Sequence, residues 1–215
     1  MKIQFALVAL AASLVFASCG NNNADTTAET PAVDSNAVVL ADGTYNIDTT
    51  AAEILWTGRK VGGEHRGTIK AIGGAINVTG GAITNAMLNI DMNSIAVTDL
   101  TGEEAADLQG HLMSDDFFGV ANFPEASIAV NNVTVGEGGL VTIAGDLTIK
   151  GITHPFTTES AAMKAEGNQM FLKGKVVVDR TLYDVKYGST KFFDNIADKA
   201  INDQFDIEFL IAATK

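Results

Sequence analysis

The sequence contains too few cysteines for disulfide bonds and few basic residues for binding nucleic acids. Its 215 residues include one cysteine, Cys19, so an exported form of the protein has no disulfide framework and this thiol has another use. Lysine and arginine number 14 against 26 aspartates and glutamates, which gives a net charge of −12. So acidic a chain lacks the basic surface with which proteins bind nucleic acids or adhere to anionic lipid headgroups.

The motifs of common enzyme classes are also missing from the sequence. There is no phosphate-binding loop, no dinucleotide fingerprint, and no serine within a Gly-x-Ser-x-Gly elbow. The histidines His65, His111 and His154 form no local metal-binding pair, although folding could still bring them together with Asp116 or Asp179. An enzyme is therefore the least supported class, and we expect neither a cofactor nor a metal site.

The N-terminus carries an export signal. Lys2 is followed by a mostly apolar run, residues 3–17, and the run ends at Ser18-Cys19. A positive charge, a short apolar core and small residues are typical of a secretory signal. A cysteine directly after them resembles the bacterial lipobox, although Phe16 stands where leucine is usual. We therefore expect residues 1–18 to be removed and Cys19 to be lipidated.

Two other interpretations of this segment remain open. A secretory signal could be cleaved beside a cysteine that has no function. A membrane-spanning helix is disfavoured, because an apolar run of 15 residues is shorter than the ~20 that a span requires.

Residues 19–41 are predicted to be a disordered tether. They are rich in Asn, Thr, Ala and Asp and contain no aromatic residue, so they cannot bury enough apolar surface to offset the entropy lost on folding. Removal of residues 1–18 takes away one lysine and no acid, which leaves 13 basic and 26 acidic residues and a net charge of −13. The remaining residues, 42–215, fit one domain.

This domain has the periodicity of β-strands. Residues 88–92 and 205–211 alternate apolar and mostly polar side chains, which is typical of strands with one buried face. Further strands are predicted at 53–60, 68–78, 127–133, 140–149, 154–162 and 170–178. Glycine pairs at 62–63, 73–74, 80–81 and 138–139, together with Lys150-Gly151, are typical of turns. About eight short strands indicate an all-β fold, either a sandwich or a closed barrel.

One short helix is predicted from Thr101 to about Met113. Thr101 can cap its N-terminus, and Glu104 three residues later completes a capping box. Leu108 and Leu112 are four residues apart and therefore share one face of the helix. We expect the helix to lie across the sheet or at its open end.

The alternating positions supply a set of candidate interior residues. An eight-stranded barrel either fills its interior with side chains or holds one small ligand, and periodicity alone does not distinguish these two cases. The Phe117-Phe118 pair follows the predicted helix and is expected to be partly buried, closing one end of a cavity. The interior candidates are Ile54, Trp56, Leu88, Ile90, Ile128, Val130, Ile143, Leu147, Phe205, Ile207 and Phe209.

Two charged sites allow both a binding and a structural interpretation. His65 and Arg66 could lie at a barrel rim and hydrogen-bond the polar head of a ligand, or they could belong to a surface turn. Asp179 and Arg180 follow a run of valines, and we favour a paired charge that holds a loop, with Asp203 as a further partner, over recognition of a ligand.

Several blocks of sequence resemble the YceI family of exported bacterial proteins. The blocks occur in the family's order and extend essentially from residue 42 to the C-terminus. They are Tyr45–Asp48 with Ile54–Gly58, His65–Gly67, His111–Phe118 with Phe123-Pro124, Gly145–Pro155, Asp179-Arg180 and Tyr183–Tyr187.

The resemblance implies a lipocalin-like antiparallel β-barrel with an elongated apolar cavity. Some members of the family hold a polyisoprenoid chain there, and others have no established ligand. Two features depart from the family pattern: the lipobox with its tether, since many members are soluble in the periplasm, and the small residues at 119–122.

The resemblance makes a membrane-anchored lipid-binding protein the expected function. Its partners would be an isoprenoid or other lipid in the cavity and the membrane through Cys19. Gly20 is not an acidic retention signal, which favours the outer membrane, facing the periplasm, within the bacterial envelope. The alternative is a structural or stress-linked envelope lipoprotein whose barrel is filled and holds no ligand.

Overall fold

The computed structural model describes residues 40–215, so the predicted signal, Cys19 and nearly all of the predicted tether lie outside the described residues. The first described residues, Leu40 and Ala41, precede the expected start of the domain at residue 42. Leu40 is buried in the apolar core, and the Tyr45 hydroxyl donates a hydrogen bond to the Ala41 carbonyl oxygen at 3.0 Å. Within this part of the chain, no helix combines the length and the apolar character that a membrane crossing requires.

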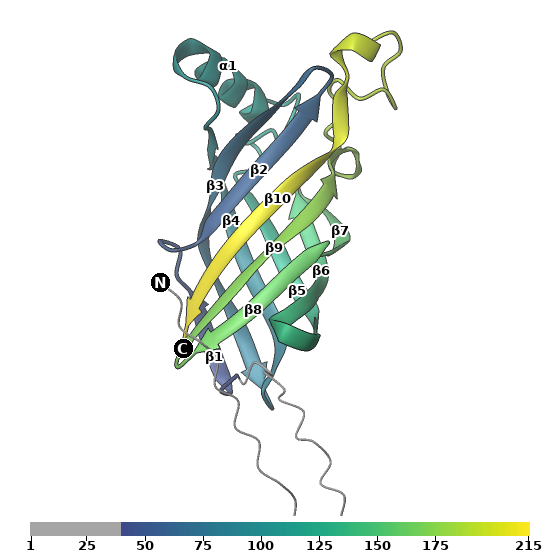
Figure 1. Ribbon diagram of the computed structural model, residues 1–215. Helices are drawn as coiled ribbons and strands as arrows, with labels where there is room; N and C mark the ends of the chain where they lie inside the picture. The colour runs from purple at the N-terminus through teal and green to yellow at the C-terminus, as the bar shows by residue number, and fades with distance from the viewer. Residues whose placement is uncertain (1–39) are drawn as a thin grey trace, which may run out of the picture. The chain divides into compact units, whose positions relative to one another are not determined.

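The described chain consists mainly of β-strands (Figure 1). Its strands are β1 (Gly43–Ile47), β2 (Glu53–Lys60), β3 (Gly63–Thr79), β4 (Ala82–Val97), β5 (Glu125–Val135), β6 (Leu140–Ile149), β7 (Ile152–Thr157), β8 (Ser160–Glu166), β9 (Gln169–Asp179) and β10 (Ile201–Thr214). The α-helix α1 spans Gly102–Met113, and the short 3-10 helices are η1 (Glu137–Gly139), η2 (Arg180–Tyr183) and η3 (Ala197–Lys199).

Eight antiparallel strands close into a ring in the order β2, β3, β4, β5, β6, β8, β9 and β10. The strand β10 completes the ring because it pairs on one side with β9, from Gln204 to Thr214, and on the other with β2, from Ile201 to Leu210. The predicted all-β fold, an antiparallel barrel of about eight strands with a short helix, is confirmed.

A carboxylate on β10 reinforces this closure. Asp206 is buried, and it accepts a hydrogen bond from Arg59 Nη2 on β2 at 2.7 Å, while Lys175 Nζ on β9 lies 3.2 Å away. Burial opposes ionisation of Asp206, but the hydrogen bonds from Arg59 and Lys175 outweigh it and lower the pKa of this carboxyl below its usual value. One buried anion therefore ties together the three strands at which the ring closes.

The predicted strand at 154–162 is wrong, because the chain breaks there into β7 and β8. Between them, Thr158 is buried, and its hydroxyl accepts a hydrogen bond from the Ile143 backbone N–H at 3.0 Å. A side chain thus takes the place of a strand partner. The strand β7 pairs with β6 from Ala144 to Ile149, whereas β8 pairs with β6 only at Leu140 and Val141.

The predicted turn at Gly73-Gly74 is also wrong, since both residues lie inside the long strand β3. The pairing of β3 with β4 shifts register between Ala71 and Gly73, which marks a bulge. A Cβ atom at position 74 would fall 2.2 Å from the Met87 carbonyl oxygen. This glycine therefore permits close approach of two backbones rather than a reversal of the chain.

The helix α1 lies at one end of the barrel, as expected, beside the turn between β2 and β3 (Figure 1). Thr101 occupies the N-cap position, but its side chain makes no capping hydrogen bond, so the predicted capping box does not form. None of the helical residues is buried, and Leu108 and Leu112 are only half-buried. The helix therefore covers the barrel end without contributing much to the core.

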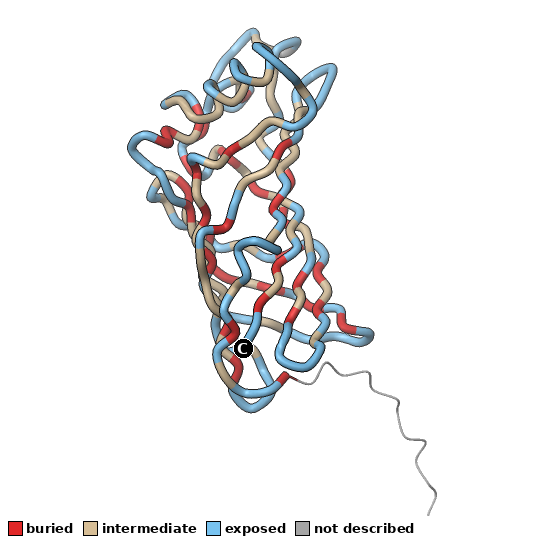
Figure 2. Tube along the Cα trace, turned by 90° about the vertical axis from the view of Figure 1, so that its left-hand side faces the viewer, coloured by how far each residue is buried: buried red, intermediate tan, exposed pale blue. Residues whose placement is uncertain are grey.

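The opposite end of the barrel is packed with apolar side chains. Tyr45 on β1, Met170 on β9 and Ala213 on β10 are at most 1 % exposed. Figure 2 shows how buried residues recur between exposed ones along the strands, as expected when one face of each strand points into the barrel. This end of the barrel therefore holds a group of closely packed, buried side chains.

Candidate functional site

The barrel contains an apolar cavity. The volume of the cavity is about 220 Å³. Of the 33 residues that line it, only Thr158, Arg180 and Asn202 have polar side chains. The cavity therefore offers almost no hydrogen-bonding partners and favours a ligand that is itself apolar.

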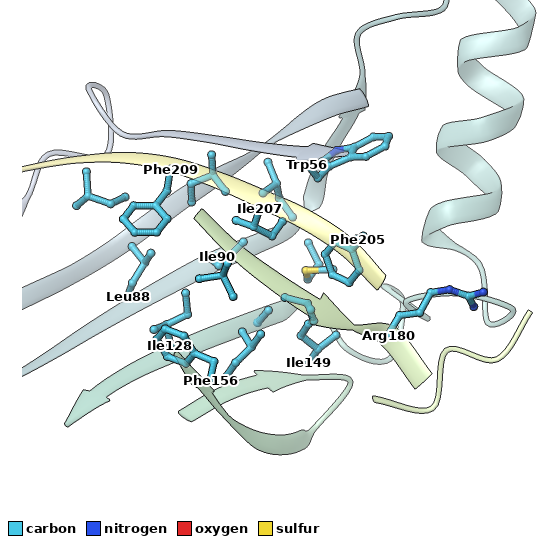
Figure 3. A pocket seen from close by; sticks show the side chains of 18 of the residues that line it. Trp56, Leu88, Ile90, Ile128, Ile149, Phe156, Arg180, Phe205, Ile207 and Phe209 are labelled. Atoms are coloured by element: carbon cyan, nitrogen blue, oxygen red, sulfur yellow. The ribbon is translucent and has the colours of Figure 1, made fainter. Parts of the chain in front are cut away.

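All the interior residues predicted from strand alternation line this cavity. Figure 3 shows that Trp56 and Arg180 lie toward the α1 end, whereas Leu88 and Phe209 lie farther along the barrel. The predicted residues in the lining are Ile54, Trp56, Leu88, Ile90, Phe117, Phe118, Ile128, Val130, Ile143, Leu147, Phe205, Ile207 and Phe209. Their binding to a ligand remains a prediction.

Other lining residues were not predicted from the sequence. Alternation along β9, where Leu172, Val176 and Val178 face inward, was a usable signal. Phe156 lies on β7, within the predicted strand at 154–162. Arg180 gave no such signal, since a charged residue is not expected in an apolar lining.

An aromatic cluster closes the cavity at the α1 end. The ring of Phe117 packs edge-on against His111, with centroids 5.0 Å apart, and lies 5.7 Å from the ring of Tyr187. Phe118 contacts Phe205 on β10, with ring centroids 6.3 Å apart. The two phenylalanines after the helix thus connect α1 to the barrel wall and to the segment that follows η2.

Trp56 is the only tryptophan of the chain, and it lines the cavity near α1. It lies opposite Gly67 on β3, where a Cβ atom would fall 2.4 Å from the indole ring and 1.8 Å from the Ala96 carbonyl oxygen. Only glycine therefore allows the indole to occupy this place. The indole Nε1 is buried and has no hydrogen-bond partner among the residues that the structure describes.

Arg180 is the one charged side chain in the lining, and it is 3 % exposed. Its guanidinium donates hydrogen bonds of 2.8–3.0 Å to the backbone carbonyls of Val185, Tyr187, Ile201 and Asn202. Burial lowers the pKa of Arg180, although Asp203 and Asp179 oppose the shift. These bonds use four of the five N–H groups of Arg180. The main role of the Arg180 guanidinium is therefore to hold the loop after η2 against β10.

The predicted role of Arg180 in holding a loop therefore agrees with its contacts, although Asp203 contributes less than expected. The nearest carboxylate oxygen of Asp203 lies 3.8 Å from Arg180 Nη2, too far for a hydrogen bond. Lys191 binds both Asp179 (2.9 Å) and Asp203 (3.2 Å), which links the loop to the ends of β9 and β10.

His65 and Arg66 are not among the residues that line the cavity, and their contact with the polar head of a ligand remains a prediction. The ring Nδ1 of His65 pairs with Asp99 at 2.9 Å, and the guanidinium of Arg66 pairs with Glu64. Both residues lie on β3 close to the turn that follows β2, and both side chains are paired with neighbouring acids.

The three histidines do not converge. His65 pairs with Asp99, His111 lies 3.6 Å from Asp116, and the ring Nε2 of His154 is 3.0 Å from the Leu182 carbonyl oxygen. In residues 40–215, no group of three or more His, Cys, Asp or Glu side chains is arranged to hold a metal ion.

A family model described as the YceI-like domain matches residues 45–213, which is almost the whole of the described barrel. The chain belongs to the YceI-like family. Relatives with significant similarity include a UPF0312 protein of Shewanella denitrificans, 34 % identical over 73 residues, and Protein YceI of Salmonella arizonae, 34 % identical over 76 residues. These alignments cover 34 % and 35 % of this chain and 35 % and 37 % of the relatives, so the chain matches only about a third of their length.

Solved structures show the same YceI-like fold at low sequence identity. BcnA of Burkholderia cenocepacia superimposes with a TM-score of 0.64 and 18 % identity, over 78 % of this chain and 99 % of that protein. A polyisoprenoid-binding domain from Saccharophagus degradans, implicated in plant cell wall breakdown, gives a TM-score of 0.59 and 19 % identity, over 79 % and 97 %. These similarities establish the architecture of the barrel for this YceI-like protein.

Proposed function

We propose that this YceI-like protein binds a long apolar ligand, of the isoprenoid class or another lipid chain, within its barrel. The observation that carries the proposal is the cavity, whose lining has three polar side chains among 33 residues. The similarity to a polyisoprenoid-binding domain supports the same ligand class. Neither a cofactor nor a catalytic group is required for this function.

The driving force would be burial of the ligand's own apolar surface. Each CH₂ group transferred from water to such a lining contributes about 0.8 kcal/mol, so a chain of many carbons binds without a strong polar contact.

A ligand-free structural lipoprotein is the alternative, and it requires a filled barrel. Buried side chains pack around Tyr45 and Met170, and a cavity of about 220 Å³ remains in the barrel. The side chains that line an apolar space of this size would lack the packing contacts that a solid core makes. The cavity therefore favours ligand binding over a purely structural role.

Mass spectrometry of organic extracts from natively purified protein tests this proposal. We expect a co-purified lipid in near-stoichiometric amount. After extraction, adding the same lipid back should change the emission of Trp56, the only tryptophan, because its indole lines the cavity. Protein that carries no lipid and shows no response of Trp56 to isoprenoid or acyl chains would favour the structural role.

We also propose that lipidated Cys19 anchors the protein in the cell envelope, in the outer membrane facing the periplasm. The support is the sequence alone, namely the signal-like residues 1–18 and the cysteine that follows them. Cys19→Ser should release the protein into the soluble fraction. An equal membrane-bound fraction in the variant would exclude lipidation as the anchor.

A further inference from the structure

Five large apolar side chains at the α1 end of the barrel are exposed. Val61 lies in the turn between β2 and β3, and Leu182, Tyr187, Phe192 and Phe193 lie on η2 and the segment after it. Each is between 44 % and 55 % exposed. We call these five residues the end patch. Figure 1 shows the segment between β9 and β10 at the same end as α1.

The local backbone holds the two phenylalanines outward. Ser189 is fully buried, and its carbonyl oxygen accepts hydrogen bonds from the backbone N–H groups of both Phe192 and Phe193 at 3.1 Å. The Val61 N–H donates to the Ala200 carbonyl oxygen at 3.0 Å, which ties this segment to the turn between β2 and β3. The end patch is therefore presented by a hydrogen-bonded framework.

The segment that bears the patch is electrically neutral in an otherwise acidic protein. Residues 182–200 contain three lysines and three aspartates, whereas the whole chain has a net charge of −12. The ammonium of Lys186 lies 5.4 Å from the centroid of the Phe192 ring, an arrangement that keeps a cation beside the exposed aromatic. This segment therefore contributes no net negative charge that would oppose contact with an apolar or zwitterionic phase.

The end patch is also joined directly to the cavity. Tyr187 is partly exposed on the outside, and its ring contacts Phe117, which lines the cavity. Arg180, in the same lining, donates a hydrogen bond to the Tyr187 carbonyl oxygen at 2.8 Å. A surface that bound the end patch would therefore lie next to the aromatic cluster around Phe117 at the α1 end of the cavity.

We propose that the end patch docks on the surface of a lipid bilayer. Half-exposed Phe, Tyr and Leu side chains beside lysines suit the boundary between headgroups and acyl chains.

Depth-dependent quenching in the full-length chain tests the docking. Phe192→Trp in a Trp56→Phe background places a single tryptophan in the patch, and Leu140→Trp in the same background is the matched control. Leu140 is also exposed, but it begins β6 at the opposite end. With phosphatidylcholine vesicles that carry brominated acyl chains, we expect the emission of the Phe192→Trp protein to shift to the blue and to fall by about half, while that of the Leu140→Trp protein changes little.

A second variant measures the contribution of the patch. Phe192→Ser with Phe193→Ser should weaken partitioning to the same vesicles about tenfold, since burial of the exposed parts of two rings corresponds to that factor or more.

Two results would overturn the proposal. One is equal quenching of the tryptophan in the Phe192→Trp protein and in the Leu140→Trp protein. The other is shielding of the tryptophan at position 192 that depends on protein concentration without vesicles, because it would assign the patch to a second copy of the chain. The test needs no cavity ligand, so its failure would leave the proposed ligand binding intact.

Discussion

Val130→Trp offers the sharpest test of ligand binding in the barrel. Val130 lines the cavity from β5, and its cross-strand neighbours are Ala86 on β4 and Gly145 on β6, the smallest side chains available. An indole at position 130 therefore has few clashes with neighbouring side chains of the barrel wall, and it extends into the space that the ligand would occupy. We expect the variant to fold and to lose its lipid.

The expected loss can be estimated from the size of the indole. It would displace a ligand segment of roughly five carbons, and at about 0.8 kcal/mol for each carbon the binding free energy falls by about 4 kcal/mol. At about 1.4 kcal/mol for each factor of ten, the affinity drops roughly a thousandfold. Overpacking of the wall costs about 1–3 kcal/mol of folding stability, or about 2–9 °C in Tm for a domain of this size.

The assay is the amount of lipid extracted per mole of natively purified protein. Asn131→Trp is the matched control, because Asn131 is the next residue of β5 and is exposed. It receives the same side chain outside the barrel and should carry as much lipid as the parent protein. If the Val130→Trp protein folds and its extract contains an undiminished amount of lipid, the ligand does not lie in this cavity.

Substitutions at three further positions test the supports of the site. Arg180→Met should lower the free energy of unfolding by about 3–5 kcal/mol in urea titrations, because four backbone carbonyls lose their donor. Arg180→Lys should recover less than half of this loss, and a cost of Arg180→Met below about 1 kcal/mol would refute the assigned role. Asp206→Asn should cost about 1–2 kcal/mol at pH 7, since both cationic partners reach solvent. The native pKa of Asp206 is lowered, so its ionised form stabilises the fold above the unfolded pKa of ~3.9, and the difference between parent and variant should vanish as pH falls through the native value. A difference that persists at the lowest pH would contradict this origin. Gly67→Val should displace Trp56, because the Cβ of the new valine would fall 1.8 Å from the Ala96 carbonyl oxygen. The displacement should appear as a red shift of the Trp56 emission and a lower Tm. Unchanged emission would show that another part of the barrel wall moves instead.

The strand interior was predictable wherever one face of a strand alternates cleanly. Along β6 and β10, inward positions such as Ile143, Leu147 and Ile207 follow a period of two, which determines the face of each strand that points into the barrel. The order of the strands in the ring was not predictable in this way. Alternation indicates which side chains share a face of a strand, but it does not indicate which strands pair. The cavity itself could not be read from residue types, because a filled core and an apolar cavity use the same side chains.

The missed features depend on single contacts between distant residues. The strand β7 ends just before Thr158, whose hydroxyl accepts a hydrogen bond from the Ile143 N–H. A threonine in an extended run does not indicate such a contact. Gly74 resembles a turn residue, whereas its role is to admit the Met87 carbonyl oxygen of the neighbouring strand. His65 and Arg66 are polar residues near the β2–β3 turn, and the sequence does not indicate that they pair with Asp99, after β4, and with Glu64, at the start of β3.

The position of β10 in the ring has a consequence for how the protein matures. The strand comes last in sequence among the ring strands, yet it must pair with β2, about 150 residues earlier, as well as with its neighbour β9. Until β10 has been synthesised, the other seven strands of the ring leave two unpaired edges, one on β2 and one on β9. The closed cavity therefore exists only once β10 is complete and has paired with both of these strands.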